Sequence, residues 1–164
     1  MLVALQVVTV TLVAIAMALA LAHALELPGK MRLPESTYRA VQAIYYPGFT
    51  IGGAAEPLAL LLLLVLIWLT PRGGAAFWLT VAAFIALAAM HATYWLLTHP
   101  VNKFWVEGVD MAGAGAKFFR VGRIDQRGAP PDWTVLRDRW EYSHIIRAVL
   151  GLVGQTLLIT AIAL

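Results

Sequence analysis

The sequence of 164 residues contains no cysteine and few charged residues. The lack of cysteine excludes disulfide bonds, thiolate metal sites and a cysteine nucleophile. Charged residues make up 13% of the chain and hydrophobic residues 61%, whereas soluble domains carry about 25% charged residues. This composition excludes a disordered chain and is atypical of a soluble domain. The chain is therefore predicted to be one integral membrane domain over residues 1–164.

The sequence contains long apolar segments that carry few charged residues. A membrane-spanning helix needs about 20 apolar residues, and four segments approach or reach this length. They are residues 2–23, 47–70, 75–98 and 141–164. The first is interpreted as a retained helix, because no basic residue precedes it as in a signal peptide. The second contains Pro57, which is expected to kink it. The predicted fold class is all-α, an antiparallel four-helix transmembrane bundle with short interfacial helices.

Basic residues are concentrated in two predicted connections, 24–46 and 99–140. Ten of the twelve Lys and Arg residues lie there, and the short turn after the second span holds only Arg72. The positive-inside rule therefore places both connections in the cytoplasm and both termini outside it, with a bacterial inner membrane as the expected location. The net charge of +3 is assigned to contact with anionic lipids, not with nucleic acid.

Local signals refine these connections. Residues 34–46 are predicted to form a short amphipathic helix at the headgroup level, and the glycine-rich basic stretch within 103–131 is predicted to be a loop. Pro100 is expected to end the third helix. Asp132 is a good N-cap, from which the fourth helix is predicted to run to Leu164.

Polar side chains within the spans gather at the cytoplasmic end. All four histidines, Glu56 and Arg147 lie in that half, while the other half holds only hydroxyls and two glutamines. Such residues are costly in hydrocarbon unless they face the bundle interior. A polar pocket at the cytoplasmic end is therefore predicted.

Helical spacing places these residues on shared faces. Trp140, His144 and Arg147 recur at i, i+4 and i+7 on the fourth helix. A second stripe follows the third helix to its end. The predicted catalytic residues are His144, Arg147 and Asn102, and the predicted substrate-binding residues are Trp140, Trp95, Tyr94, His91 and Glu56.

Each of these residues also has a purely structural interpretation. Glu56 and Arg147 are equally suited to a structural ion pair, and His91 to a hydrogen bond with a neighbouring helix. The tryptophans also fit an aromatic belt. His23 and His99, at the membrane interface, are expected to be solvated.

The motif Pro100-Val-Asn102, followed by Trp140-Glu-Tyr-Ser-His144-Ile-Ile-Arg147, resembles the anthrone-oxygenase-like family of small four-helix integral membrane proteins. The resemblance in size and topology covers the whole chain, and the motifs cover about a dozen residues. It implies oxidation of anthrones to anthraquinones without a metal or flavin. It also implies that Asn102, Trp140, His144 and Arg147 form the polar signature of the family. The basic stretch after Asn102 is longer than the connection expected for the family.

The enzymatic hypothesis is a cofactor-independent oxygenase that acts on a flat, hydrophobic, anthrone-like aromatic with O₂. His144 would be the base and Arg147 would stabilise an oxyanion. Asn102 would bond a carbonyl or hydroxyl group, and the aromatic side chains would stack on the rings. The expected partners are this aromatic molecule, O₂ and membrane lipids.

Two alternatives stay open. Glu56 and the histidines offer N and O ligands for a metal, although the Glu-x-x-His motif of di-iron bundles is absent from the sequence. The non-enzymatic alternative is an accessory or lipid-binding subunit of a larger membrane complex or homo-oligomer, because Gly- and Ala-rich faces suit lateral helix contacts.

Overall fold

The computed structural model describes residues 1–46, 48–105 and 132–164. Every regular element in these ranges is helical, which confirms the all-α fold class. The elements are α1 (Leu2–Lys30), α2 (Glu35–Gln42), η1 (Ala43–Tyr45), α3 (Gly48–Gly53), α4 (Ala55–Leu69), α5 (Ala75–Thr93), the π-helical turn η2 (Tyr94–Thr98), α6 (His99–Trp105) and α8 (Trp133–Ala163). Pro47 and the part of the predicted basic loop beyond residue 105 lie outside the described residues.

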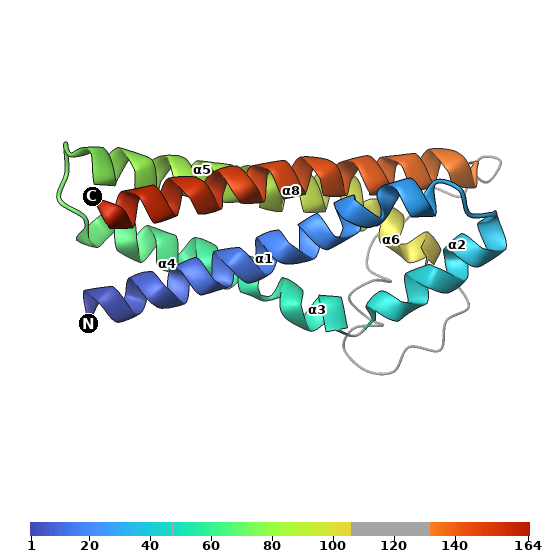
Figure 1. The fold of residues 1–164 in the computed structure, drawn as a ribbon, viewed down its shortest axis with the longest axis horizontal. Coiled ribbons are helices and arrows are strands. Elements are labelled where there is room, and N and C mark those ends of the chain that lie inside the picture. The colour runs from blue at the N-terminus through green and yellow to red at the C-terminus, as the bar shows by residue number, and fades with distance from the viewer. Residues whose placement is uncertain (47, 106–131) are drawn as a thin grey trace.

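Four long apolar helices form an antiparallel bundle (Figure 1). They are Leu2–Lys30, Gly48–Leu69, Ala75–Asn102 and Trp133–Ala163, each long and apolar enough to cross a membrane. Both α1 and α5 pack against α8 and α4, so the four helices close a ring. Both termini lie at the same end as the turn between α4 and α5 (Figure 1). The chain is an integral membrane protein.

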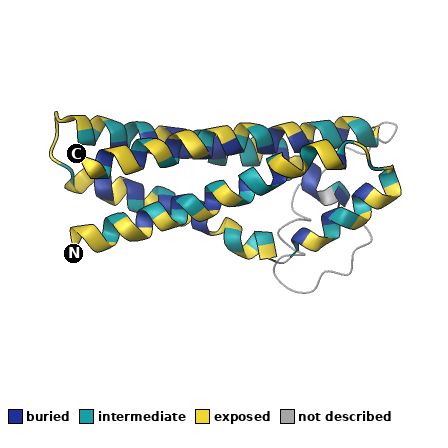
Figure 2. Ribbon diagram, viewed as in Figure 1, coloured by how far each residue is buried: buried dark blue, intermediate teal, exposed yellow. Residues whose placement is uncertain are grey.

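Small residues bring the helices of this ring close together. A Cβ on Gly151 would lie 3.1 Å from the side chain of Met17, so glycine permits the close approach of α8 to α1. Alanine lines the buried faces at Ala16, Ala59 and Ala83. The buried residues form an inner stripe along the bundle, and the outer faces are exposed (Figure 2). The large exposed side chains are mostly apolar, as lipid contact requires.

The predicted kink at Pro57 is present as a break between α3 and α4. Proline has no amide hydrogen for the carbonyl four residues earlier, here that of Gly53, and its ring clashes with that carbonyl. The break falls at Ala54, directly after Gly53, and the Ala54 amide donates to the Ile51 carbonyl at 3.2 Å. As a result, α3 leaves the line of α4 (Figure 1).

The expectation that Pro100 ends the third helix is wrong. The helix continues through η2 and α6 to Trp105. Pro100 deprives the Leu96 carbonyl of its helical donor, and Arg139 on α8 replaces it. The Arg139 guanidinium donates to the carbonyls of Leu96 at 2.7 Å and Leu97 at 3.2 Å. Because freed backbone groups in a membrane helix can be satisfied by a neighbouring helix, the chain stays helical.

The other helix ends are close to expectation, with one exception. The Asp132 side chain accepts a hydrogen bond from the Thr134 amide at 2.9 Å, as predicted for an N-cap, and α8 runs on to Ala163. Residues 35–45 form α2 and η1 within the predicted amphipathic segment. In contrast, α1 continues beyond the predicted residue 23 to Lys30, because Lys30 is buried and pairs with Glu26 one turn earlier at 2.8 Å.

The orientation of the bundle is testable with single cysteines, because the chain has none. Gly73 has a φ of +91°, which favours glycine, so the label belongs at Gly74, where a Cβ meets no atom within 4 Å. We expect Gly74→Cys to react with a membrane-impermeant maleimide on intact cells. Ser36→Cys, on the other side of the bundle, should react only after lysis. The reverse pattern would place the termini in the cytoplasm.

The role of Arg139 is testable by a double-mutant cycle with Pro100. Arg139→Met should lower the free energy of unfolding by about 1 kcal/mol, because it leaves the Leu96 carbonyl without the donor that replaces the missing Pro100 amide. Pro100→Ala restores an amide hydrogen for the Leu96 carbonyl, so the same Arg139→Met change should cost less in that background. Denaturant unfolding in detergent measures both. Equal costs in the two backgrounds would contradict this account.

Candidate functional site

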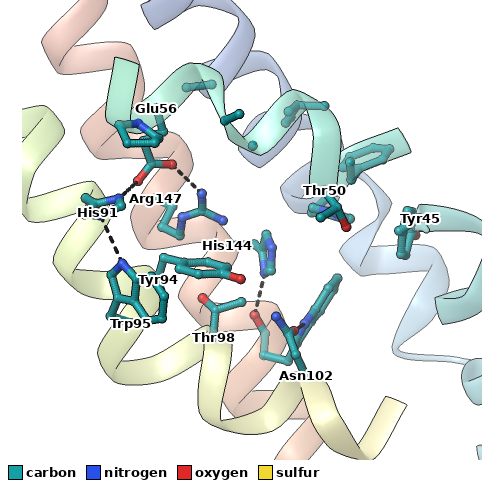
Figure 3. A pocket seen from close by; sticks show the side chains of 18 of the residues that line it. Tyr45, Thr50, Glu56, His91, Tyr94, Trp95, Thr98, Asn102, His144 and Arg147 are labelled. Atoms are coloured by element: carbon teal, nitrogen blue, oxygen red, sulfur yellow. Dashed lines mark hydrogen bonds and ion pairs between the residues drawn. The ribbon is translucent and has the colours of Figure 1, made fainter. Parts of the chain in front are cut away.

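A cavity of about 460 Å³ lies between the helices at the end where α3 diverges. Pockets for small molecules have about 300–1,000 Å³, so the size fits such a ligand. All eight residues selected from the sequence line this one cavity, and Figure 3 labels seven of them. They are Glu56, His91, Tyr94, Trp95, Asn102, Trp140, His144 and Arg147. Their common location follows from the shared helix faces, while their chemical roles stay predictions.

Glu56 and Arg147 form the ion pair that their burial makes necessary. Arg147 Nη2 on α8 donates to Glu56 Oε2 on α4 at 2.7 Å, and the two side chains are 11% and 4% exposed. The guanidinium also lies over the ring of Tyr94, 5.1 Å from its centroid. Arg147 Nε is buried and has no hydrogen-bond partner among the described residues. The arginine therefore has a donor left for a ligand.

His91 is held by two partners that fix its proton. Its Nδ1 lies 3.0 Å from Glu56 Oε1, and its Nε2 lies 3.0 Å from Trp95 Nε1. The indole nitrogen is only a donor, so His91 Nε2 accepts and Nδ1 carries the proton donated to Glu56. Both nitrogens are occupied, so His91 orients Glu56 and Trp95 in this arrangement. The Trp95 side chain is at the edge of the cavity and is 44% exposed.

His144 differs from His91 because only one of its nitrogens is engaged. Its Nδ1 lies 2.9 Å from the carbonyl oxygen of Trp140, one turn earlier on α8. A carbonyl only accepts, so Nδ1 carries the proton and Nε2 of the neutral ring keeps a lone pair. No described residue is hydrogen-bonded to this Nε2. His144 therefore offers a proton acceptor in the wall of the cavity.

Trp140 and Asn102 complete this wall. Trp140 Nε1 donates to Asn102 Oδ1 at 2.8 Å, and the Trp140 ring lies 4.0 Å from that of His144. The contact joins α6 to α8 and engages the amide oxygen of Asn102. Thr50 on α3 adds a buried hydroxyl that has no partner within the described part of the chain. Asn102 and Thr50 thus place polar groups opposite the Glu56 end of the cavity (Figure 3).

The expectation that His23 is solvated is wrong. His23 is 5% exposed and lines the cavity, with its ring 4.3 Å from that of His144 and 4.4 Å from that of Tyr45. The sequence contained a signal for this burial, because His23 continues the buried face of Val13, Ala16 and Ala20 at helical spacing. His99 is half-buried, lies 3.4 Å from the Tyr94 hydroxyl and does not line the cavity.

A second polar cluster adjoins the cavity on the side of α2. Lys30 Nζ is buried between the rings of Tyr45 and Trp140, 4.7 Å from each centroid. Glu26 forms an ion pair with Lys30 at 2.8 Å and accepts a hydrogen bond from the Tyr45 hydroxyl at 2.5 Å. Glu141 is fully buried and accepts from a tyrosine hydroxyl of α2 at 2.8 Å. Glu26, Lys30 and Glu141 were not selected from the sequence, because their partners come from three separate segments.

The described residues do not bring metal ligands together. Among them, no three His, Asp or Glu side chains are grouped closely enough to hold one ion. Glu56, the carboxylate of the metal hypothesis, has its two oxygens on Arg147 and His91. In this arrangement the Glu56 carboxylate is the anion of the ion pair with Arg147.

Comparison with family models, with curated proteins and with solved structures gives no match to this chain. The geometry of the cavity is therefore the observation on which a function must be argued.

The ion pair can be tested by a double-mutant cycle. Glu56→Gln and Arg147→Met should each lower the free energy of unfolding by about 3–5 kcal/mol, because each leaves a buried charge unpaired. The double variant should lose much less than the sum. Unfolding in detergent provides the measurement, and additive losses would show that the two side chains do not interact.

Proposed function

We propose that the protein is a membrane-embedded, cofactor-independent oxygenase that oxidises a flat, hydrophobic aromatic of the anthrone type with O₂. The observation that carries the proposal is the Nε2 of His144, which no described residue engages, in a cavity that is also lined by Arg147. The resemblance of the Asn102 and Trp140–Arg147 motifs to anthrone-oxygenase-like proteins supports the same activity.

The first step is removal of a proton from an acidic CH₂ group. In an anthrone this carbon lies between two aromatic rings, opposite the ring carbonyl, so its carbanion is delocalised as an enolate. His144 Nε2 accepts the proton, as a general base with a neutral imidazole can. Arg147 Nε faces the negative oxygen that develops, and Asn102 offers its amide nitrogen. The Glu56 carboxylate keeps the guanidinium oriented in the cavity.

The carbanion then reacts with O₂, which is the oxidant. One electron passes to O₂, and the resulting radicals combine to a carbon-bound peroxide that takes the proton from His144. Removal of the second hydrogen as a proton, with cleavage of the O–O bond, forms the new carbonyl. The other oxygen atom leaves as water with both protons. The carbon loses four electrons and O₂ gains four, so no metal or flavin is needed for balance.

The surroundings favour this kind of substrate. Aromatic side chains of η1 and the residue that follows it, and of α3, η2 and α8, line the cavity and suit a planar ring system. They are Tyr45, Tyr46, Phe49, Tyr94, Trp95 and Trp140. Apolar aromatics and O₂ both dissolve in the bilayer around the helices. We place the termini outside the cytoplasm of a bacterial inner membrane, so the cavity opens near the cytoplasmic face.

The proposal is tested by O₂ uptake in detergent with a series of anthrones and related phenols. His144→Ala should lower the rate by about 10²–10⁴-fold if His144 is the base, and added imidazole should restore part of it. Arg147→Lys should also lose activity, because a point charge does not reproduce the planar guanidinium. Tyr142→Ala, on the exposed side of the same helix, is the matched control and should retain activity.

Three results would contradict the proposal. Wild-type activity in His144→Ala would remove the proposed base. Loss of activity on treatment with a chelator would favour the metal alternative. Binding of aromatics without O₂ uptake would favour the accessory or lipid-binding subunit.

A further inference from the structure

His23 is a buried titratable side chain that the proposed reaction does not use. Its Nδ1 is buried and has no hydrogen-bond partner among the described residues. Its ring is in edge contact with that of His144, with 4.3 Å between centroids. An unsatisfied buried nitrogen is costly, and the ring that carries it lies directly beside that of the proposed base.

Glu26 connects this histidine with the surface of the bundle. Glu26 Oε2 lies 3.7 Å from His23 Nδ1, and the Glu26 side chain is 41% exposed. Glu26 also lines an open surface groove with Lys30 and Arg32, outside the cavity. The carboxylate thus contacts the buried histidine on one side and solvent on the other.

We propose that His23 and Glu26 form a proton path between His144 and the aqueous edge of the bundle. The proposal rests on the proposed function in taking His144 as the base. An imidazole can accept a proton at one nitrogen and release one from the other. When Nδ1 of His23 accepts a proton from Glu26, the other ring nitrogen of His23 therefore releases one toward His144. The same two steps in reverse carry a proton from His144 out to Glu26.

The surrounding charges explain why a proton on His144 needs a route outward. The nearby cations Arg147 and Lys30 are each paired with a carboxylate, whereas a protonated His144 would be a buried positive charge bonded only to a backbone carbonyl among the described residues. The anions that face the path, Glu26 on α1 and Glu141 on α8, lie on the side of Lys30. A proton is therefore held at lower cost toward Glu26 than at His144.

Tyr45 supports the path without accepting the proton. Burial, reinforced by the hydrogen bond to the Glu26 carboxylate, raises the pKa of the Tyr45 hydroxyl. The hydroxyl therefore keeps its proton and donates to Glu26 Oε2 at 2.5 Å. It fixes the carboxylate oxygen that lies closest to His23.

The path can be measured without a substrate, by exchange of the His144 ring hydrogen with water. In the neutral ring this hydrogen is on Nδ1 and bonded to a carbonyl, so exchange requires a proton to reach Nε2 first. We would record exchange by NMR on the ¹⁵N-histidine-labelled full chain in detergent. Glu26→Gln and His23→Phe should each slow exchange by about tenfold or more, because each interrupts a proton-transfer step.

The two variants keep different contacts of the native fold, so a slower exchange in both cannot be assigned to the loss of one contact. His23→Phe retains an aromatic ring against Tyr45 and His144, while Glu26→Gln retains an oxygen for the Tyr45 hydroxyl. Glu35→Gln is the matched control, because Glu35 is 44% exposed and is also paired one turn away, with Arg39 at 2.8 Å. It should exchange at the wild-type rate.

The outcome is independent of the oxygenase assay. Wild-type exchange in either variant, or equal slowing in Glu35→Gln, would overturn the path even if O₂ uptake is found. Slow exchange confined to the two path variants would support it even if no anthrone is oxidised, and the proposed function would then fail alone.

Discussion

The carboxylate of Glu56 is the contact on which the geometry of the cavity depends. It accepts from Arg147 on α8 and from His91 on α5, while its own backbone belongs to α4. A lone charge is too costly inside a bundle that spans a membrane, so these three helices must keep their register. The register in turn sets the position of Arg147 Nε and of the Trp95 indole bonded to His91. The same interaction therefore stabilises the bundle and orients the wall of the cavity.

Two prolines make room for this cavity at one end of an otherwise closely packed bundle. Pro57 separates α3 from α4, and Phe49 and Thr50 of α3 line the space. Pro100 is accommodated by the π-helical turn η2, which brings Tyr94 and Trp95 to the opposite wall. π-Turns are frequent at functional sites because they re-aim side chains at a cost in regular hydrogen bonding. Here Arg139 recovers part of that cost by donating to the Leu96 carbonyl, which Pro100 leaves without its helical donor.

The fold class and the members of the site could be predicted from the sequence, because both follow from periodicity. Apolar runs define the four helices, and the spacing of Trp140, His144 and Arg147 places them on one face. The continuation of the helix through Pro100 could not be predicted, because its compensating donor, Arg139, is distant in the sequence and supplied by another helix. The burial of His23 was likewise missed, because it depends on η1 and α8 covering the end of α1.

His91 and His144, the two histidines predicted for the site, differ in their hydrogen-bond partners, and this difference determines which of them has a nitrogen available to accept a proton. His91 bonds a carboxylate through one nitrogen and an indole through the other, so its lone pair is already engaged. Among the described residues, His144 bonds to a backbone carbonyl alone, and that carbonyl also accepts from Ser143 at 2.7 Å. A backbone oxygen fixed on a helix cannot take part in proton transfer as a carboxylate can, so it sets the tautomer of His144 without competing for its proton. The Nδ1 of His144 therefore keeps its proton on the carbonyl of α8. A proton that enters or leaves the neutral ring does so at Nε2, which carries the lone pair.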